Sequence, residues 1–159
     1  MRQTITILLV IMALAMIAGC RKDEGNKNGT DVSPPHKPNK ASVIVVPDSV
    51  MGKWKAVRIA LLDKSADRES VFTVEIGSRY SIPGTKLSID VESFLPDFTM
   101  NGTVMTSLSN EPKNPAARVR IFEDGKEIFD GWLFSIYPTI HAVRHPRYGF
   151  TLVGFIPSA

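Results

Sequence analysis

The stretch "ARVRIFEDGKEIFDGWLF", residues 117–134, decides the fold class of this sequence. Apolar and charged residues alternate over 117–121, which is typical of a strand with one buried and one solvated face. The next four residues, Glu-Asp-Gly-Lys at 123–126, predict a two-residue hairpin, because Asp and Gly tolerate the positive φ angles of a type I′ turn. A turn there would pair Glu123 with Lys126 and Ile121 with Ile128.

The second arm of this hairpin carries the aromatic residues. Trp132 and Phe134 fall on one predicted strand face together with Ile128, and core packing is the expected role of such aromatics. Gly131 lies inside the strand and indicates a bulge or a close backbone approach. Pro138 is expected to end the strand.

The same two-residue period continues along most of the chain. It predicts further strands over residues 43–46, 53–62, 72–76, 87–92 and 149–155, with a turn at Pro83-Gly84. No segment of ten or more residues has an apolar helical stripe. We therefore expect an all-β fold, a small β-sandwich or partly open barrel of about seven or eight short antiparallel strands.

The N-terminus has the features of a secretory signal. Arg2 precedes an apolar run from Ile7 to Ala18, which is shorter than the roughly 20 residues of a membrane-spanning helix. The exit, Ile-Ala-Gly-Cys at 17–20, resembles the bacterial lipobox, and this resemblance implies cleavage after residue 19 and lipidation of Cys20. An ordinary signal peptide that ends near a Cys is the alternative. Arg21 after the Cys favours the outer membrane, facing the periplasm, over the inner membrane.

Composition divides the remainder into a tether and a domain. Residues 20–41 comprise Cys20 and a polar, Pro-containing segment with little to bury, and residues 42–159 form a single predicted β domain. The formal charge of +3 is too balanced to indicate a nucleic-acid partner. The expected partners are the membrane, through Cys20, and an envelope protein.

His141 and His145 are the candidate metal ligands. On a helix they would share one face, but Pro146 disfavours the helical conformation at His145, and their segment offers no Asp, Glu or Cys. We interpret them as loop histidines that bond to backbone, and we expect no metal and no cofactor. The sequence lacks a nucleophile elbow, a phosphate-binding loop and a C-x-x-C pair, so we expect no catalytic residue and no enzyme.

Two surfaces could contact a partner. Arg118 and Arg120 project from the wet face of their strand, next to Arg144 and Arg147 of the later loop, as a solvated face or an anion-binding patch. The apolar cluster at 94–98 either caps the core or, if exposed, offers a partner contact.

The late residues resemble a known family. The run 129–134, followed by Pro138, Ala142, His145-Pro146 and Tyr148, is similar to the signature of a bacterial envelope family, domain-of-unknown-function family 2155. Elements at 62–68 and 77–89 fit in order, so the resemblance spans about residues 56–156. It singles out as motif or interaction residues Gly131, Trp132, Phe134, Pro138, His145, Pro146 and Tyr148.

This resemblance implies a periplasmic or membrane-associated location and brings no reaction or cofactor. The resemblance implies two Cys, paired in a disulfide, in typical members, and this domain lacks both. Residues 114–138 also resemble the periplasmic portion of ResB-type cytochrome c biogenesis proteins. We expect a membrane-anchored periplasmic lipoprotein with a non-enzymatic binding, structural or assembly role. The alternative is a haem- or metal-handling accessory related to cytochrome c biogenesis.

Overall fold

The structure, a computed structural model, describes residues 41–159. The predicted signal peptide, Cys20 and almost all of the tether lie outside these residues and stay predictions. The described residues contain no helix, and so none that could cross a membrane. They form the strands β1 (Val43–Ile44), β2 (Trp54–Asp63), β3 (Arg68–Glu75), β4 (Ser78–Ser81), β5 (Leu87–Leu95), β6 (Phe98–Asn101), β7 (Val104–Ser107), β8 (Ala116–Glu123), β9 (Lys126–Phe134) and β10 (Tyr148–Pro157).

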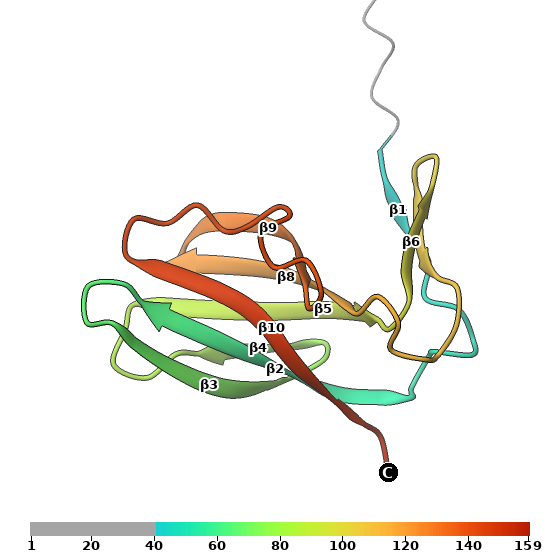
Figure 1. The fold of residues 1–159 in the computed structure, drawn as a ribbon, viewed down its shortest axis with the longest axis horizontal. Coiled ribbons are helices and arrows are strands. Elements are labelled where there is room, and N and C mark those ends of the chain that lie inside the picture. The colour runs from blue at the N-terminus through green and yellow to red at the C-terminus, as the bar shows by residue number, and fades with distance from the viewer. Residues whose placement is uncertain (1–40) are drawn as a thin grey trace, which may run out of the picture. The chain divides into compact units, whose positions relative to one another are not determined.

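The strands form three sheets (Figure 1). A four-stranded sheet has the order β4-β5-β8-β9, and a three-stranded sheet has the order β10-β2-β3. The third sheet, β1-β7-β6, is small, and we call it the side sheet. All neighbouring strands are antiparallel except β1 and β7, which pair in parallel. The expectation of an all-β fold is confirmed, and no sheet closes into a barrel.

The two larger sheets pack face to face around the main core. In β2 the buried side chains of Val57, Ile59 and Leu61 point to one face, as the period of two requires. They meet buried residues of the opposite sheet, among them Ile89 of β5 and Val119 of β8. This is sandwich packing, in which the inner faces of two sheets interdigitate.

A second apolar cluster joins the four-stranded sheet to the side sheet. It contains Leu95, Ala116, Trp132 and Phe134, with residues of the side sheet packed against them. The ring of Phe98, on β6, makes edge contacts with both aromatics, at centroid distances of 4.9 Å to Trp132 and 5.1 Å to Phe134. Core packing of both aromatics, as expected, is confirmed.

The central hairpin differs in one detail from its prediction. Glu123 pairs with Lys126, and Asp124 and Gly125 have φ angles of 51° and 79°, so the turn is confirmed. Ile121, however, pairs with Phe129, and the predicted pair with Ile128 is wrong. Ile128 is an extra residue in β9, a β-bulge that the residue pattern does not reveal.

The bulge changes which side chains share a face. Ile128 packs against the main core, whereas Trp132 and Phe134 belong to the second cluster. Gly131 is paired regularly with Val119 and is not the bulge. The predicted close backbone approach is not found either. The neighbour is a side chain, because a Cβ at Gly131 would lie only 2.6 Å from Cζ of the Phe129 ring.

The remaining differences concern short elements. β9 ends at Phe134, and Pro138 begins a turn four residues later, so Pro138 does not end the strand. Strands β4, β6 and β7 were not expected, because each has only four residues and no long apolar alternation. The apolar cluster at 94–98 caps the core, with Phe94 only 3% exposed, so a partner contact through Phe94 is wrong.

Candidate functional site

Two regions hold most of the residues that the sequence singled out. The first is where β2 ends beside the start of β10. Arg147 forms a two-pronged ion pair with Asp63, with Nη2 2.7 Å from Oδ2 and Nε 3.1 Å from Oδ1. Lys64 donates from Nζ to the carbonyl of His145 at 2.8 Å. We call this group, together with Tyr148, the motif corner.

His145 organises the motif corner through its ring. Its Nδ1 accepts hydrogen bonds from the backbone N–H groups of Arg147, at 3.1 Å, and Tyr148, at 2.9 Å. The other nitrogen, Nε2, lies 3.3 Å from Oε2 of Glu123 in the hairpin turn of the opposite sheet. The ring also stacks on Tyr148, with centroids 5.1 Å apart. His145 is therefore a loop histidine bonded to backbone, as interpreted from the sequence, and both of its nitrogens are engaged.

The ion pair in this corner is electrostatically strong. Hydrogen bonds from Arg147 and from the hydroxyl of Ser65 hold the pKa of Asp63 well below its ordinary value. The same contact raises the pKa of Arg147. Asp63 thus stays ionised at neutral pH, and its ion pair with Arg147 ties the connection before β10 to the end of β2.

The second region is a groove of ≈ 720 Å³ along β9, which we call the β9 groove. Its first side is β9, and its second is the connection of residues 135–147, which passes over β9 in Figure 1. The third side is the side sheet and the chain before β1. The groove is lined by Ser42, Ile44, Met100, Met105, Arg118, Ile128, Phe129, Asp130, Gly131, Trp132, His141, Ala142 and Arg144.

The groove runs along a free strand edge. β9 is the last strand of its sheet, and residues 128–132 line the groove consecutively, on both faces of the strand. Within residues 41–159, the outward backbone groups of β9 have no backbone hydrogen-bond partner. An edge of this kind can accept an added extended segment.

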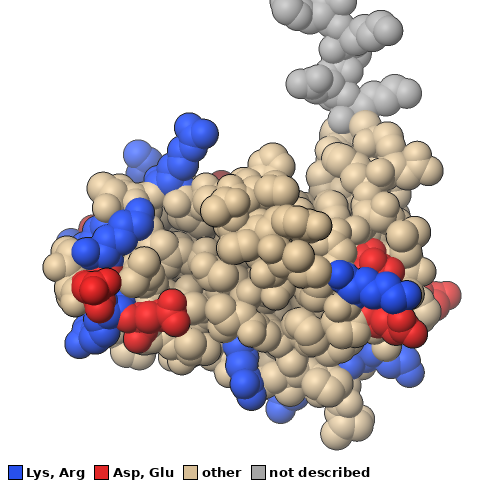
Figure 2. Space-filling model, in the orientation of Figure 1, with Lys and Arg blue, Asp and Glu red and all other residues tan. Residues whose placement is uncertain are grey.

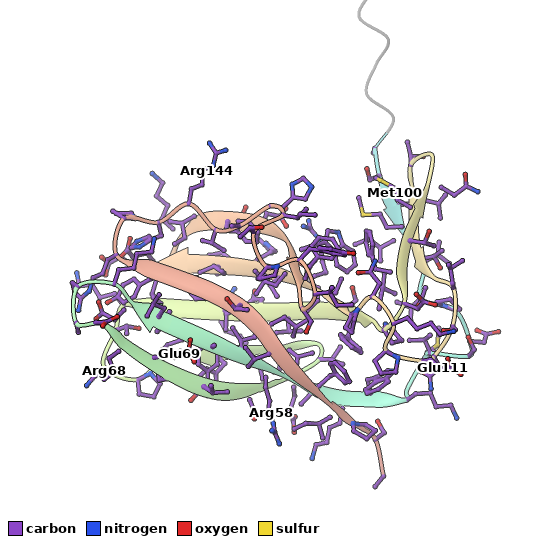
Figure 3. The ribbon with its side chains drawn as sticks, in the orientation of Figure 1. Arg58, Arg68, Glu69, Met100, Glu111 and Arg144 are labelled. Atoms are coloured by element: carbon purple, nitrogen blue, oxygen red, sulfur yellow. The ribbon has the colours of Figure 1, made fainter. Side chains whose placement is uncertain are left out.

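The groove holds both paired and exposed charge. Arg118 forms ion pairs with Asp130 and, at 3.7 Å, with Glu92, and only 20% of its side chain is exposed. Arg144 is exposed and points away from the sheets in Figure 3. The expected patch of four arginines is divided, because Arg120 pairs with Glu127 and Arg147 with Asp63.

Large apolar side chains are exposed on two of the segments that bound the groove. Ile136, Tyr137 and Ile140 of the connection are 51%, 54% and 48% exposed, and Met100 on the side sheet is 50% exposed. Figure 2 shows charged side chains at the two ends and along the lower margin of the drawn face, around an uncharged middle. Exposed apolar residues beside a hollow are typical of a contact surface.

A row of side chains crosses the side sheet where it faces Trp132. Ile44, Met105 and Met100 are direct partners on β1, β7 and β6, so their side chains share one face. The indole N–H of Trp132 points at Sδ of Met105, at 3.1 Å. His141, in the connection that also lines the groove, has a φ angle of 54°, which is uncommon outside glycine.

The family of the chain follows from a comparison with family models. A model described as "Uncharacterized protein conserved in bacteria (DUF2155)" matches residues 57–154. The chain belongs to this family. The match begins in β2 and ends in β10, so it covers the sandwich and agrees with the resemblance at residues 56–156. No curated protein and no solved structure matches the chain.

The structure places the residues that the resemblance to family 2155 singled out in the two regions, in the second cluster and in the connection. Gly131 and Trp132 line the β9 groove, as does Ala142. Phe134 lies in the second cluster, and Pro138 opens the turn of the connection. His145, Pro146 and Tyr148 lie in or beside the motif corner, where the earlier family-2155 element at 62–64 joins them.

Sequence reasoning missed Met100 and Met105. The signal that could have found them is the Asn101-Gly102 turn, because Gly102, with a φ angle of 60°, closes a hairpin that sets the two methionines opposite each other. Within residues 41–159, no group of three His, Cys, Asp or Glu could hold a metal ion. His141 and His145 are also divided between the groove and the motif corner.

Proposed function

We propose that this family-2155 protein is a lipoprotein anchored through Cys20 in the outer membrane, facing the periplasm, and that its β domain binds another envelope protein without catalysing a reaction. The lipobox-like residues 17–20 support the anchor. The inner membrane is the less favoured location, because Arg21 follows the Cys. The β9 groove is the proposed binding surface.

One observation carries the binding role. The β9 groove combines the unpaired edge of β9 with the family-2155 motif residues Gly131 and Trp132. Strand addition to such an edge supplies affinity through backbone hydrogen bonds, while neighbouring pockets read the side chains of the added segment. Exposed Arg144 on the wall favours a segment that carries a carboxylate.

The polar groups of the groove support binding rather than catalysis. Asp130 and Arg118 are paired with each other, so neither is poised as a free acid or base. The hypothesis of a haem- or metal-handling accessory centred on His141 and His145 has less support. Both ring nitrogens of His145 are held by other groups of the motif corner.

Site-specific photo-crosslinking in cells tests the binding role. A photoreactive residue placed at Ile128 or Arg144, in the groove, should capture a defined envelope protein. The same residue at Val71 or Val153, exposed on β3 and β10, should not. Arg144→Glu should reduce capture from Ile128 by roughly tenfold, which corresponds to about 1.4 kcal/mol. The matched control Arg58→Glu reverses an exposed charge on β2 and should leave capture unchanged.

Two controls keep this test decisive. Equal capture from all four positions would contradict a groove-specific partner, as would full capture by the Arg144→Glu protein. The anchor is tested separately by Cys20→Ser. This change should release the protein from the outer-membrane fraction if Cys20 is lipidated, and unchanged fractionation would refute the proposed anchor.

A further inference from the structure

The two methionines of the β9 groove are placed unlike ordinary core methionines. Met100 and Met105 are two of the three methionines in the described residues, and they are direct cross-strand partners. Side chains of such partners start from Cβ atoms about 5 Å apart on the same face. Met100 is 50% exposed, so it does not serve as a buried gap filler.

The groups around this pair suit a soft cation. The connection between β9 and β10 presents His141 to the same groove, and its imidazole makes no hydrogen bond or ion pair with another described residue. Trp132 lies against Met105 with its indole N–H directed at the sulfur, and with only 7% of the residue exposed it shields that side of the pair from solvent. Thioether sulfur and imidazole nitrogen together are a ligand set that selects Cu(I) over hard cations such as Mg²⁺ or Ca²⁺.

The charge of the groove disfavours a divalent ion more than a singly charged one. Asp130, the one carboxylate among the lining residues, is paired with Arg118, and Arg144 adds positive charge to the wall. A divalent ion would meet net repulsion and would lack a carboxylate ligand. Thioethers bind as neutral groups and carry no proton, so a Cu(I) site of this kind needs no charged ligand.

We propose that the β9 groove binds Cu(I) through the thioether sulfurs of Met100 and Met105, with the imidazole of His141 as the third ligand. Trp132 covers one side of the ion. The site does not use His145, and it differs in that respect from the pair that the sequence suggested. It does not depend on the proposed protein partner, because none of its three ligands belongs to β9, whose edge the partner contacts.

Silver titration of the full chain purified in detergent tests the site, because Ag(I) is a redox-stable stand-in for Cu(I). With methyl-labelled methionine, the resonances of Met100 and Met105 should shift together and saturate at one equivalent. Met51, which lies in another part of the domain, is the internal control and should not move. Competition with a chromophoric Cu(I) chelator should then give the affinity.

Matched variants assign the ligands. Met100→Leu and Met105→Leu nearly conserve volume, so the fold should persist, as near-ultraviolet circular dichroism would verify. Each should weaken Cu(I) binding by at least the roughly 10–100-fold that loss of an outer-shell partner causes. His141→Gln should weaken binding by roughly tenfold, and Met51→Leu should leave it unchanged.

Three results would overturn the proposal. The first is the absence of a shift at Met100 and Met105 with one equivalent of Ag(I). The second is unchanged Cu(I) affinity in the Met100→Leu/Met105→Leu protein. The third is stronger binding of Zn²⁺ than of Cu(I) at these residues. Photo-crosslinking from Ile128 depends on neither methionine. A protein that fails to bind Cu(I) but still crosslinks, or the reverse, therefore separates failure of the metal site from failure of the proposed partner.

Discussion

At the scale of single residues, Gly131 is the described glycine with the least room for a side chain. The ring of Phe129 lies where a side chain at position 131 would begin, and Gly131 has no positive φ angle that would need glycine for another reason. An aromatic ring lying on a strand glycine recovers apolar contact that the glycine itself lacks. The neighbouring ring, and not the backbone conformation, therefore requires glycine at position 131.

Gly131→Ala should accordingly destabilise the domain. The added Cβ would displace Phe129 from the main core, at a cost of about 1–3 kcal/mol in the free energy of unfolding. Gly149→Ala is the control, because its Cβ would meet Leu62 at an ordinary 3.7 Å and should change stability by less than about 1 kcal/mol. Urea unfolding measures both, and an equal effect of the two changes would disprove the role of the Phe129 ring.

Asp63 gives the domain a defined response to acid. Because its pKa in the folded state is lowered by Arg147, the ion pair adds stability at pH values above the unfolded pKa of about 3.9. That contribution is lost as the pH falls from about 4 through the lower folded pKa. Asp63→Asn should lower stability at neutral pH and flatten the loss of stability below pH 4.

Urea unfolding between pH 2.5 and pH 7 measures this difference. Asp67→Asn is a suitable control, because Asp67 is an exposed carboxylate in the same β2–β3 connection. Parallel curves for the Asp63→Asn protein and the unchanged protein, offset by a constant amount, would show that the carboxylate contributes nothing to acid unfolding.

At the scale of elements, β10 is the strand on which the sandwich most depends. It pairs with β2 along its full length and contributes Tyr148, Phe150 and Leu152 to the main core. Each such core side chain is worth about 2–5 kcal/mol, so their sum is comparable with the 5–15 kcal/mol by which domains are stable.

A chain that stops after Arg147 should therefore lose cooperative unfolding. Thermal unfolding followed by near-ultraviolet circular dichroism should show no transition for this truncation. A chain that stops after Pro157 is the control. It loses only the bond from Ser158 N–H to the carbonyl of Lys53, and so no more than about 1.5 kcal/mol. A normal transition in the shorter chain would contradict the central place given to β10.

The strands differ in how well their sequence predicts them. The Asp124-Gly125 hairpin was predictable because turn chemistry and charge pairing are local. The bulge at Ile128 was not predictable. An extra residue shifts the register between β8 and β9, and that register depends on the neighbouring strand rather than on the local sequence. Strands β6 and β7 are held by packing of Phe98 and Met105 against Trp132, which no local pattern encodes.

At the scale of the whole molecule, alternation of apolar residues predicted an all-β fold but not its topology. The ladder of β2 and β10 joins residues as distant in sequence as Trp54 and Pro157, and neither segment carries a local signal that identifies the other as its partner. The candidate site has the same limit. Gly131 and Trp132 were predictable from the family-like motif, whereas the wall with Met100 arises only when the side sheet folds against β9.

The parallel pair β1–β7 has a mechanical consequence. The chain enters the domain at Ala41, and its first backbone hydrogen bonds run from Val43 to Thr103 and from Val45 to Met105. A force applied to the N-terminal chain would therefore act on the hydrogen bonds between β1 and β7 before it reached any strand of the sandwich. Rupture there would remove Ile44 from beside Met105 and spare the main core. In a domain held by its N-terminus, this wall of the groove would therefore be the first part to unfold under force.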